Sequence, residues 1–200
     1  WILSYGAESD SEGKFKIPNV GRGKYKLQAT RVGFVSISDD YQMAERSDVL
    51  LDLDYPQQLD DVEMRMTPQA VITGRVLDGD GDPMAAKVEL LRPRYRYGKK
   101  VLATFGTTRT NDLGEYRWSG LMPGVYYLYM ESDSLIPPAS AIPKAFVPLY
   151  YPGARDSAGA LPIEASAAAE NRVADVVLPK EPTATVRGRV VVEPAGPGDS

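Results

Sequence analysis

One stretch of this chain recurs further along it, and this repetition constrains the fold more than any other feature. Residues 9–29 align with residues 110–130 at an offset of 101 positions. The matched positions carry glycine, apolar or aromatic residues: Gly13 with Gly114, Phe15 with Tyr116, Ile17 with Trp118, Val20 with Leu121, Gly23 with Gly124, Tyr25 with Tyr126 and Leu27 with Leu128. Self-similarity of this kind predicts a series of like structural units.

A second match places the joints between the units. Residues 61–76 align with residues 175–190 at an offset of 114 positions, and Pro68 falls on Pro182. The two offsets predict a complete domain at 68–180, preceded by the C-terminal part of a first repeat at 1–67 and followed by the first strand of a third repeat at 181–200. Proline has a fixed φ and no N–H, which suits a short stiff linker. We therefore expect this sequence to be an excerpt of a longer array.

Apolar and polar side chains alternate within the complete unit, which is the period of a half-buried β-strand. Gly- and Pro-rich clusters such as 79–83 and 122–124 predict turns between the strands. The Ala-rich stretch 165–170 is compatible with one helical turn or with a loop. Strands are expected at 71–77, around Ala86, Val88 and Leu90, at 101–107, around Tyr116 and Trp118, and at 125–131, 145–150, 161–164 and 173–178. The spacing predicts an all-β fold built as a two-sheet sandwich.

The side-chain phase in these strands also predicts the core. Ile72, Val76, Ala86, Val88, Leu90, Tyr116, Trp118, Tyr126, Leu128 and Met130 are expected to face inward. The polar residues between them, including Lys87 and Glu89, are expected to face outward.

Composition excludes most common active sites. The chain contains no His and no Cys, which removes Ser-His-Asp and Cys-His triads, Cys/His zinc sites and disulfides. Lys and Arg number 23 against 27 Asp and Glu, for a net charge of −4, which argues against a dedicated binder of nucleic acid or of anionic membranes. There is no apolar run near the roughly 18 residues of a membrane-spanning helix. We therefore expect no enzyme, no cofactor, no nucleic-acid partner and no membrane span.

Five spaced elements in order carry a family pattern: Ile72-x-Gly74-x-Val76-x-Asp78, Gly81-x-Pro83, Ala86-x-Val88-x-Leu90, Thr110-x-x-x-Gly114-x-Tyr116, and Gly120-Leu121-x-Pro123-Gly124-x-Tyr126-x-Leu128. This pattern resembles the carboxypeptidase regulatory-like domain. That domain is a transthyretin-like (prealbumin-like) β-sandwich, similar to the B-type repeats of collagen adhesins. The resemblance implies tandem Ig-like or transthyretin-like sandwiches, here one complete and two partial.

The resemblance also implies an extracytoplasmic, non-catalytic module of a secreted, periplasmic or outer-membrane-associated bacterial protein. The leading hypothesis is a structural spacer that presents other domains, with neighbouring domains of the same chain as its partners. The alternative is a carbohydrate-binding module whose partner is a polysaccharide, or contact with a cell-surface protein. The fold family is grouped with carbohydrate-binding sandwiches, but the fold alone assigns no ligand.

An expected exposed loop at 92–100 supplies contact residues for the alternative. Arg94, Tyr95, Arg96 and Tyr97 lie in it, and Tyr127 and Tyr129 fall on the outward phase of a later strand. Tyrosine rings stack on sugars and arginine pairs with acidic groups. A solvated loop that protects a sheet edge explains the same residues.

The acidic candidates are weaker. Asp78, Asp80 and Asp82 alternate as in a calcium loop, but no bidentate Glu follows at the required position, so a hairpin turn is favoured. Paired acids at 39–40 and 60–61 have the chemistry of a glycosidase pair, but they lie in polar turns. Ser11 and Lys14 have the spacing of a Ser-x-x-Lys enzyme, yet they align with a hairpin turn. A Lys–Asn isopeptide bond is not expected either.

Overall fold

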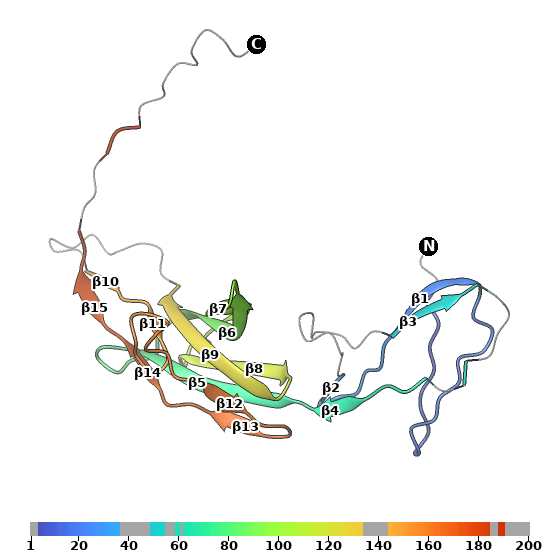
Figure 1. Cartoon of the computed structure of the whole chain (residues 1–200). Coiled ribbons are helices and arrows are strands. Elements are labelled where there is room, and N and C mark those ends of the chain that lie inside the picture. The colour runs from blue at the N-terminus through green and yellow to red at the C-terminus, as the bar shows by residue number, and fades with distance from the viewer. Residues whose placement is uncertain are drawn as a thin grey trace, which may run out of the picture. The chain divides into compact units, whose positions relative to one another are not determined.

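The computed structural model describes residues 4–36, 49–54, 59–60, 62–133, 144–184 and 188–190. Every regular element in these residues is a strand, so the chain is all-β (Figure 1). The chain divides into two compact units. The first comprises 1–71 with 119–124 and 165–170, and the second comprises 72–118, 125–164 and 171–200. No described helix is long and apolar enough to cross a membrane.

The first four strands, up to Pro68, form two antiparallel pairs. β1 (Gly23–Leu27) pairs with β3 (Val49–Leu53), and β2 (Phe34–Ser36) pairs with β4 (Met66–Pro68). Exposed and half-buried side chains alternate along β1 and β3, as expected for a ribbon with one apolar face. Among the described residues before Ala70, no side chain is buried.

The strands from Ala70 to Pro182 build two larger sheets and a ribbon (Figure 1). They are β5 (Ala70–Asp78), β6 (Ala86–Arg96), β7 (Lys99–Arg109), β8 (Glu115–Leu121), β9 (Gly124–Ser132), β10 (Lys144–Phe146), β11 (Leu149–Tyr150), β12 (Ile163–Ala165), β13 (Glu170–Arg172), β14 (Val176–Leu178) and β15 (Lys180–Pro182). One sheet has the order β11-β9-β6-β7, with β12 also on β9. The other has the order β13-β5-β14, with β8 also on β5, while β10 and β15 form the ribbon.

The core of the second unit consists of every second side chain of these strands. Val76, Val88, Leu128 and Met130 are fully buried, as the alternation predicts. Aromatic rings pack closely against glycines on two strands. A Cβ at Gly74 would lie 2.4 Å from the Tyr116 Oη, and a Cβ at Gly106 would lie 3.1 Å from the half-buried Trp118 ring. The Gly106 contact joins β7 of one sheet to β8 of the other.

The same turn occurs in both copies of the repeated sequence. Asn111 Oδ1 accepts hydrogen bonds from the backbone N–H groups two and four residues later, at 3.0 and 2.9 Å. Asp10 Oδ1 accepts the two equivalent bonds, both at 2.9 Å. Gly114 and Gly13 complete the two turns with φ of 72° and 81°. The side-chain cap and the glycine are the sequence features that determine this turn.

Backbone geometry and strand pairing continue the match. Further equivalent residues share a positive φ: Asn19 (58°) with Gly120 (70°), and Gly23 (148°) with Gly124 (156°). The β1–β3 pair is equivalent in sequence to the β9–β12 pair. The β2–β4 ribbon ends at Pro68, and the β10–β15 ribbon ends at Pro182, which aligns with Pro68 in the sequence.

Most of the predicted strands are confirmed, but one local prediction was wrong. Residues 92–100 are not a loop, because β6 continues to Arg96 and β7 begins at Lys99. Only Tyr97 and Gly98 turn the chain, with φ of 51° and 74°, and a two-residue hairpin turn of this kind matches the twist of its strands. The Ala-rich stretch 165–170 contains a turn, with Ala168 at φ 58°, between the ends of β12 and β13.

Candidate functional site

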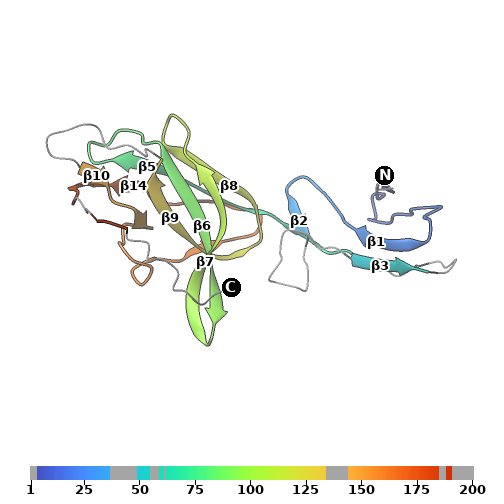
Figure 2. The same ribbon diagram turned by 90° about the horizontal axis from the view of Figure 1, so that it is seen from above.

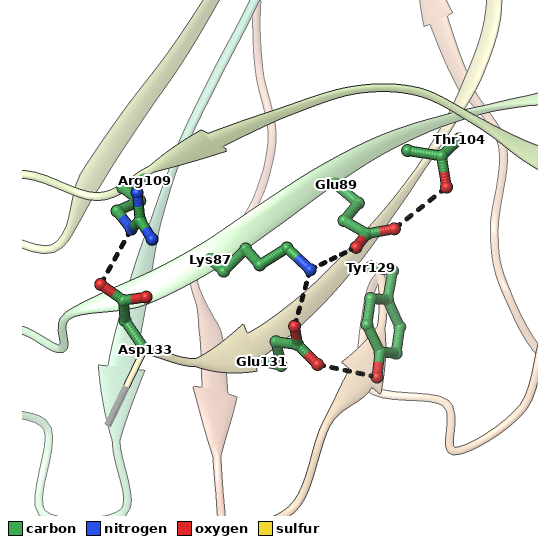
Figure 3. Close-up of polar contacts among 7 residues, drawn as sticks. All are labelled: Lys87, Glu89, Thr104, Arg109, Tyr129, Glu131 and Asp133. Atoms are coloured by element: carbon green, nitrogen blue, oxygen red, sulfur yellow. Dashed lines mark hydrogen bonds and ion pairs between the residues drawn. The ribbon is translucent and has the colours of Figure 1, made fainter. Parts of the chain in front are cut away.

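A cluster of charged residues lies on the outer face of the larger sheet (Figure 3). Lys87 on β6 faces Glu131 on β9 as its register partner. The Lys87 Nζ lies 2.7 Å from a carboxylate oxygen of Glu89 and 2.8 Å from one of Glu131. Hydrogen bonds to Glu131 and then to Glu89 raise the pKa of Lys87. The lysine is therefore held charged between two carboxylates, on the outward phase that the sequence predicts.

The remaining carboxylate oxygens of this cluster are also occupied. The Thr104 hydroxyl donates to Glu89 at 3.1 Å, and the Tyr129 hydroxyl donates to Glu131 at 3.4 Å (Figure 3). Burial, followed by the charge of Glu131, raises the pKa of Tyr129. All four oxygens of the two glutamates thus have a donor, and the cluster joins β7, β6 and β9. Such a network holds the three strands in register.

The β6–β7 hairpin projects beyond the rest of its sheet (Figure 2). β6 pairs with β9 only as far as Leu91, but it pairs with β7 as far as Arg96. The tip is solvated, since Tyr95 is 79% exposed and Tyr97 is 94% exposed. Three cations, Arg94, Arg96 and Lys99, have no ion-pair partner within the described part of the chain.

Two cations of this hairpin contact neighbouring tyrosines of β9 on opposite faces of the sheet. The Arg92 guanidinium lies 4.4 Å from the ring centre of Phe105 and 4.6 Å from that of Tyr126, and it donates to the Tyr126 hydroxyl. The Lys100 Nζ lies 2.9 Å from the Tyr127 hydroxyl, and this hydrogen bond raises the pKa of Lys100. Because Tyr126 and Tyr127 are neighbours on β9, their side chains point to opposite faces. These contacts fix the projecting hairpin to β9.

The six predicted contact residues occupy three locations. Arg94, Tyr95, Arg96 and Tyr97 are on the hairpin and exposed. The prediction that Tyr127 is exposed was wrong: it is 6% exposed, because Lys100 lies over its ring and hydroxyl. Tyr129 is half-buried in the charged cluster, and its ring centre is 5.0 Å from that of Tyr150. The carbohydrate-binding alternative gains no support from this division.

The acidic candidates have structural partners or lie elsewhere. Asp78 Oδ1 accepts hydrogen bonds from the backbone N–H groups of Asp80 and Asp82, at 2.9 and 3.0 Å. These bonds, that of Asp82 first, lower the pKa of Asp78. Within the described residues, no group of three or more Asp, Glu, His or Cys side chains is placed to hold a metal ion. Asp60 is exposed, whereas positions 39, 40 and 61 lie outside the described residues.

Ser11 and Lys14 belong to the turn that Asp10 caps, and Lys14 pairs with Glu12. The structure therefore places the Ser-x-x-Lys spacing in an exposed turn, as its alignment with residues 112–115 predicts.

The sequence did not predict the charged cluster or the contacts of Arg92 with Phe105 and Tyr126. The available signal was the alternation of Lys87 and Glu89 on the outward phase, but the partner on β9 depends on the register between distant strands. Two further buried polar atoms, the Tyr116 Oη and the Trp118 Nε1, have no hydrogen-bond partner in the described structure. Burial raises the pKa of Tyr116. Both atoms belong to rings whose role is to fill the space opposite Gly74 and Gly106.

Comparison with known proteins gives no family. No protein-family model matches the chain, and no curated protein matches it. Among solved structures, a minor pilin of the gram-positive pathogen Streptococcus agalactiae is 19% identical with a TM-score of 0.33, covering 92% of this chain and 71% of that one. A streptococcal ancillary pilin is 17% identical with a TM-score of 0.30, covering 82% of this chain and 44% of that one. Scores this low carry no functional argument, which must come from the geometry of the chain itself.

Proposed function

We propose that this chain is a load-bearing structural segment of a secreted or cell-envelope bacterial protein, in which tandem β-sandwich modules space or present other domains. Residues 1–67 would then be part of one repeat, residues 68–180 a complete module and residues 181–200 the start of another. Each module would be of the carboxypeptidase regulatory-like type and non-catalytic. The repeated turns and strand pairings at equivalent positions support the tandem arrangement.

One observation carries the mechanical role. β5 is the first strand of the complete module and β14 lies near the module's C-terminal end. The two strands pair in parallel, with Val76 opposite Val176 and Asp78 opposite Leu178. In a parallel pair, the N-terminus of one strand and the C-terminus of the other lie at opposite ends. Tension between the two joints therefore loads the hydrogen bonds of this pair in shear, so that they resist together. A pair loaded from one end opens one bond at a time.

Hydrogen bonds also hold the residues beside Pro68 and Pro182 within their own units. Within the first unit, the Gln69 N–H donates to the Gly33 carbonyl at 2.9 Å, and the Gln69 carbonyl accepts from the Ala168 N–H at 3.0 Å. Its side-chain oxygen accepts from the Gly120 N–H at 2.9 Å. At the other joint, Glu181 on β15 receives two hydrogen bonds from Arg155. Each exit of the module is thus tied by hydrogen bonds.

Single-molecule pulling tests the mechanical role, and the absence of Cys from the chain makes specific attachment simple. Handles at Glu63→Cys and Ala184→Cys load β5 and β14 from opposite ends. Handles at Asp80→Cys and Ala184→Cys load the same pair from one end and serve as the matched control. We expect the first geometry to require the higher unfolding force. Equal forces in the two geometries would contradict the load-bearing role.

A further inference from the structure

The β1–β3 ribbon of the first unit presents an apolar face on which the Tyr5 ring packs against Tyr25, with ring centres 5.7 Å apart, and no second sheet covers this face in the described structure. Tyr25 is the register partner of Leu51, and Leu27 is the partner of Val49, so the four side chains lie on one face. All four are only half-buried. A two-stranded ribbon alone is marginally stable in water, and lysines at positions 24 and 26 mark the opposite face as the solvated one.

The second unit shows what covers an equivalent face. Tyr126 and Leu128 on β9 are equivalent to Tyr25 and Leu27, and both are fully buried. Ile163 on β12, equivalent to Val49, is also buried. These residues share one core with side chains of β5 and β6, among them Ile72, Val76, Val88 and Leu90. The difference in burial between the two copies is therefore the presence of a second layer.

A second strand position in the first unit shows the same deficit. Val62 and Met64 are equivalent to Val176 and Leu178 on β14, which pair in parallel with β5 and are buried. Val62 and Met64 are half-buried, and they belong to no strand. The backbone at 62–64 is thus placed to accept a parallel strand like β5.

We infer that the apolar face of β1–β3, together with residues 62–64, binds a β-sheet with the sequence pattern of residues 69–109, contributed by another repeat of the same kind. The occupant presents Ile, Val or Leu at every second position and adds one strand in parallel register to 62–64. This inference rests on the proposed tandem organisation. The equivalent residues of the second unit pack against such a sheet within the same chain.

The test extends the full chain with the expected partner. A copy of residues 69–109 replaces residues 1–8, so that it leads into Ser9 as residue 109 leads into Thr110. Amide hydrogen exchange is then measured at 23–27, 49–53 and 62–64. We expect exchange there to slow by at least about 100-fold, toward that of β9, because these amides join a packed sheet. Unchanged exchange would contradict the inference.

A matched pair of variants separates specific packing from mere extension. In the added copy, Ile72→Asp and Val88→Asp change core-facing positions and should abolish the gain in protection. Thr73→Asp in the added copy changes a position on the other side of the same strand and should preserve most of the gain. Equal protection with both variants would overturn the inference, since the face would then not select an apolar partner.

Cross-linking gives a second measurement that does not depend on stability. Leu77 is opposite Val177 in the second unit, and the residue equivalent to Val177 is Glu63. A disulfide should therefore form between Leu77→Cys of the added copy and Glu63→Cys, but not with Arg65→Cys, two residues out of register. No preference between these partners, with unchanged exchange, would reject the inference. The pulling experiment compares two loading geometries of the β5–β14 pair and does not depend on an occupant of the β1–β3 face, so its outcome tests the proposed function separately.

Discussion

The two copies of the repeated sequence share their turns and differ in their burial. The turns capped by Asp10 and Asn111 have the same hydrogen bonds. Yet Phe15, which follows the first turn, is 38% exposed, whereas its equivalent Tyr116 is 3% exposed. The comparison separates two levels of structure. A few local residues determine the turn, while the burial of an apolar face depends on strands supplied from far along a chain.

The largest expected difference between the copies is in the stability effect of core truncation. Leu128→Ala removes a fully buried side chain and should lower the free energy of unfolding by about 2–5 kcal/mol. Leu27→Ala, the equivalent change on a half-buried face, should cost less than about 1 kcal/mol. Chemical denaturation of the two variants measures both values. Equal losses would show that the first unit has a core of its own.

Two aligned glycines, Gly74 and Gly188, differ in the space available for an added methyl group, so the same substitution should affect stability differently at the two positions. Gly74→Ala places a methyl group against the buried ring of Tyr116 and should cost about 1–3 kcal/mol. Gly188 aligns with Gly74 in the second sequence match, and no atom lies within 4 Å of a Cβ added there. Gly188→Ala should therefore leave thermal unfolding unchanged. A comparable loss at both positions would mean that the Tyr116 contact is not the reason for glycine at position 74.

The turn capped by the Asp78 carboxylate should respond to pH, whereas the turn capped by the Asn111 amide should not. The pKa of Asp78 is lowered in the folded chain by hydrogen bonds from Asp82 and Asp80. Its contribution to stability is therefore present above the unfolded pKa of roughly 3.9, and it is lost as pH falls through the lower folded value. Asp78→Asn should keep the turn, as Asn111 does in its own turn, and remove this part of the acid dependence. Denaturation curves between about pH 5 and pH 2 compare the two, and identical acid dependence would contradict the assignment.

The smallest effect is expected at the hairpin tip, where the second unit is as exposed as the first. Arg94→Ser and Arg96→Ser remove cations without an ion-pair partner in the described structure and should leave the midpoint of urea denaturation unchanged. Arg92→Ser removes the contacts with Phe105 and Tyr126 and should lower that midpoint. A tip variant as harmful as Arg92→Ser would mean that the tip packs on another surface.

The sequence predicted what depends on neighbouring residues. Alternation identified β5, β6, β7 and β9, together with the inward positions of Val88, Leu128 and Met130. The sequence did not predict the length of the β6–β7 hairpin, because the stretch after Leu91 is charged and lacks alternating apolar residues. Its strands form through pairing with each other and through the two-residue turn at Tyr97 and Gly98.

The remaining features depend on contacts between distant segments. The parallel pairing of β5 with β14 brings together residues about a hundred positions apart, and no local signal encodes such a register. The burial of Tyr127 follows from Lys100 on another strand. The charged cluster likewise requires Lys87 and Glu131 to be register partners. The predicted contact residues were chosen by residue type and by their outward phase, which do not show that a residue of another strand covers Tyr127.

Hydrogen exchange in the unmodified chain tests the central comparison most directly. Amides of β9 at 126–130 and of β1 at 25–27 carry the same pattern of side chains and are measured in one sample. We predict exchange of the β9 amides only on unfolding of the module, and exchange of the β1 amides through local opening at far lower free energy. Equal protection of the two strands would contradict the account, because the same sequence would then be equally packed in both units.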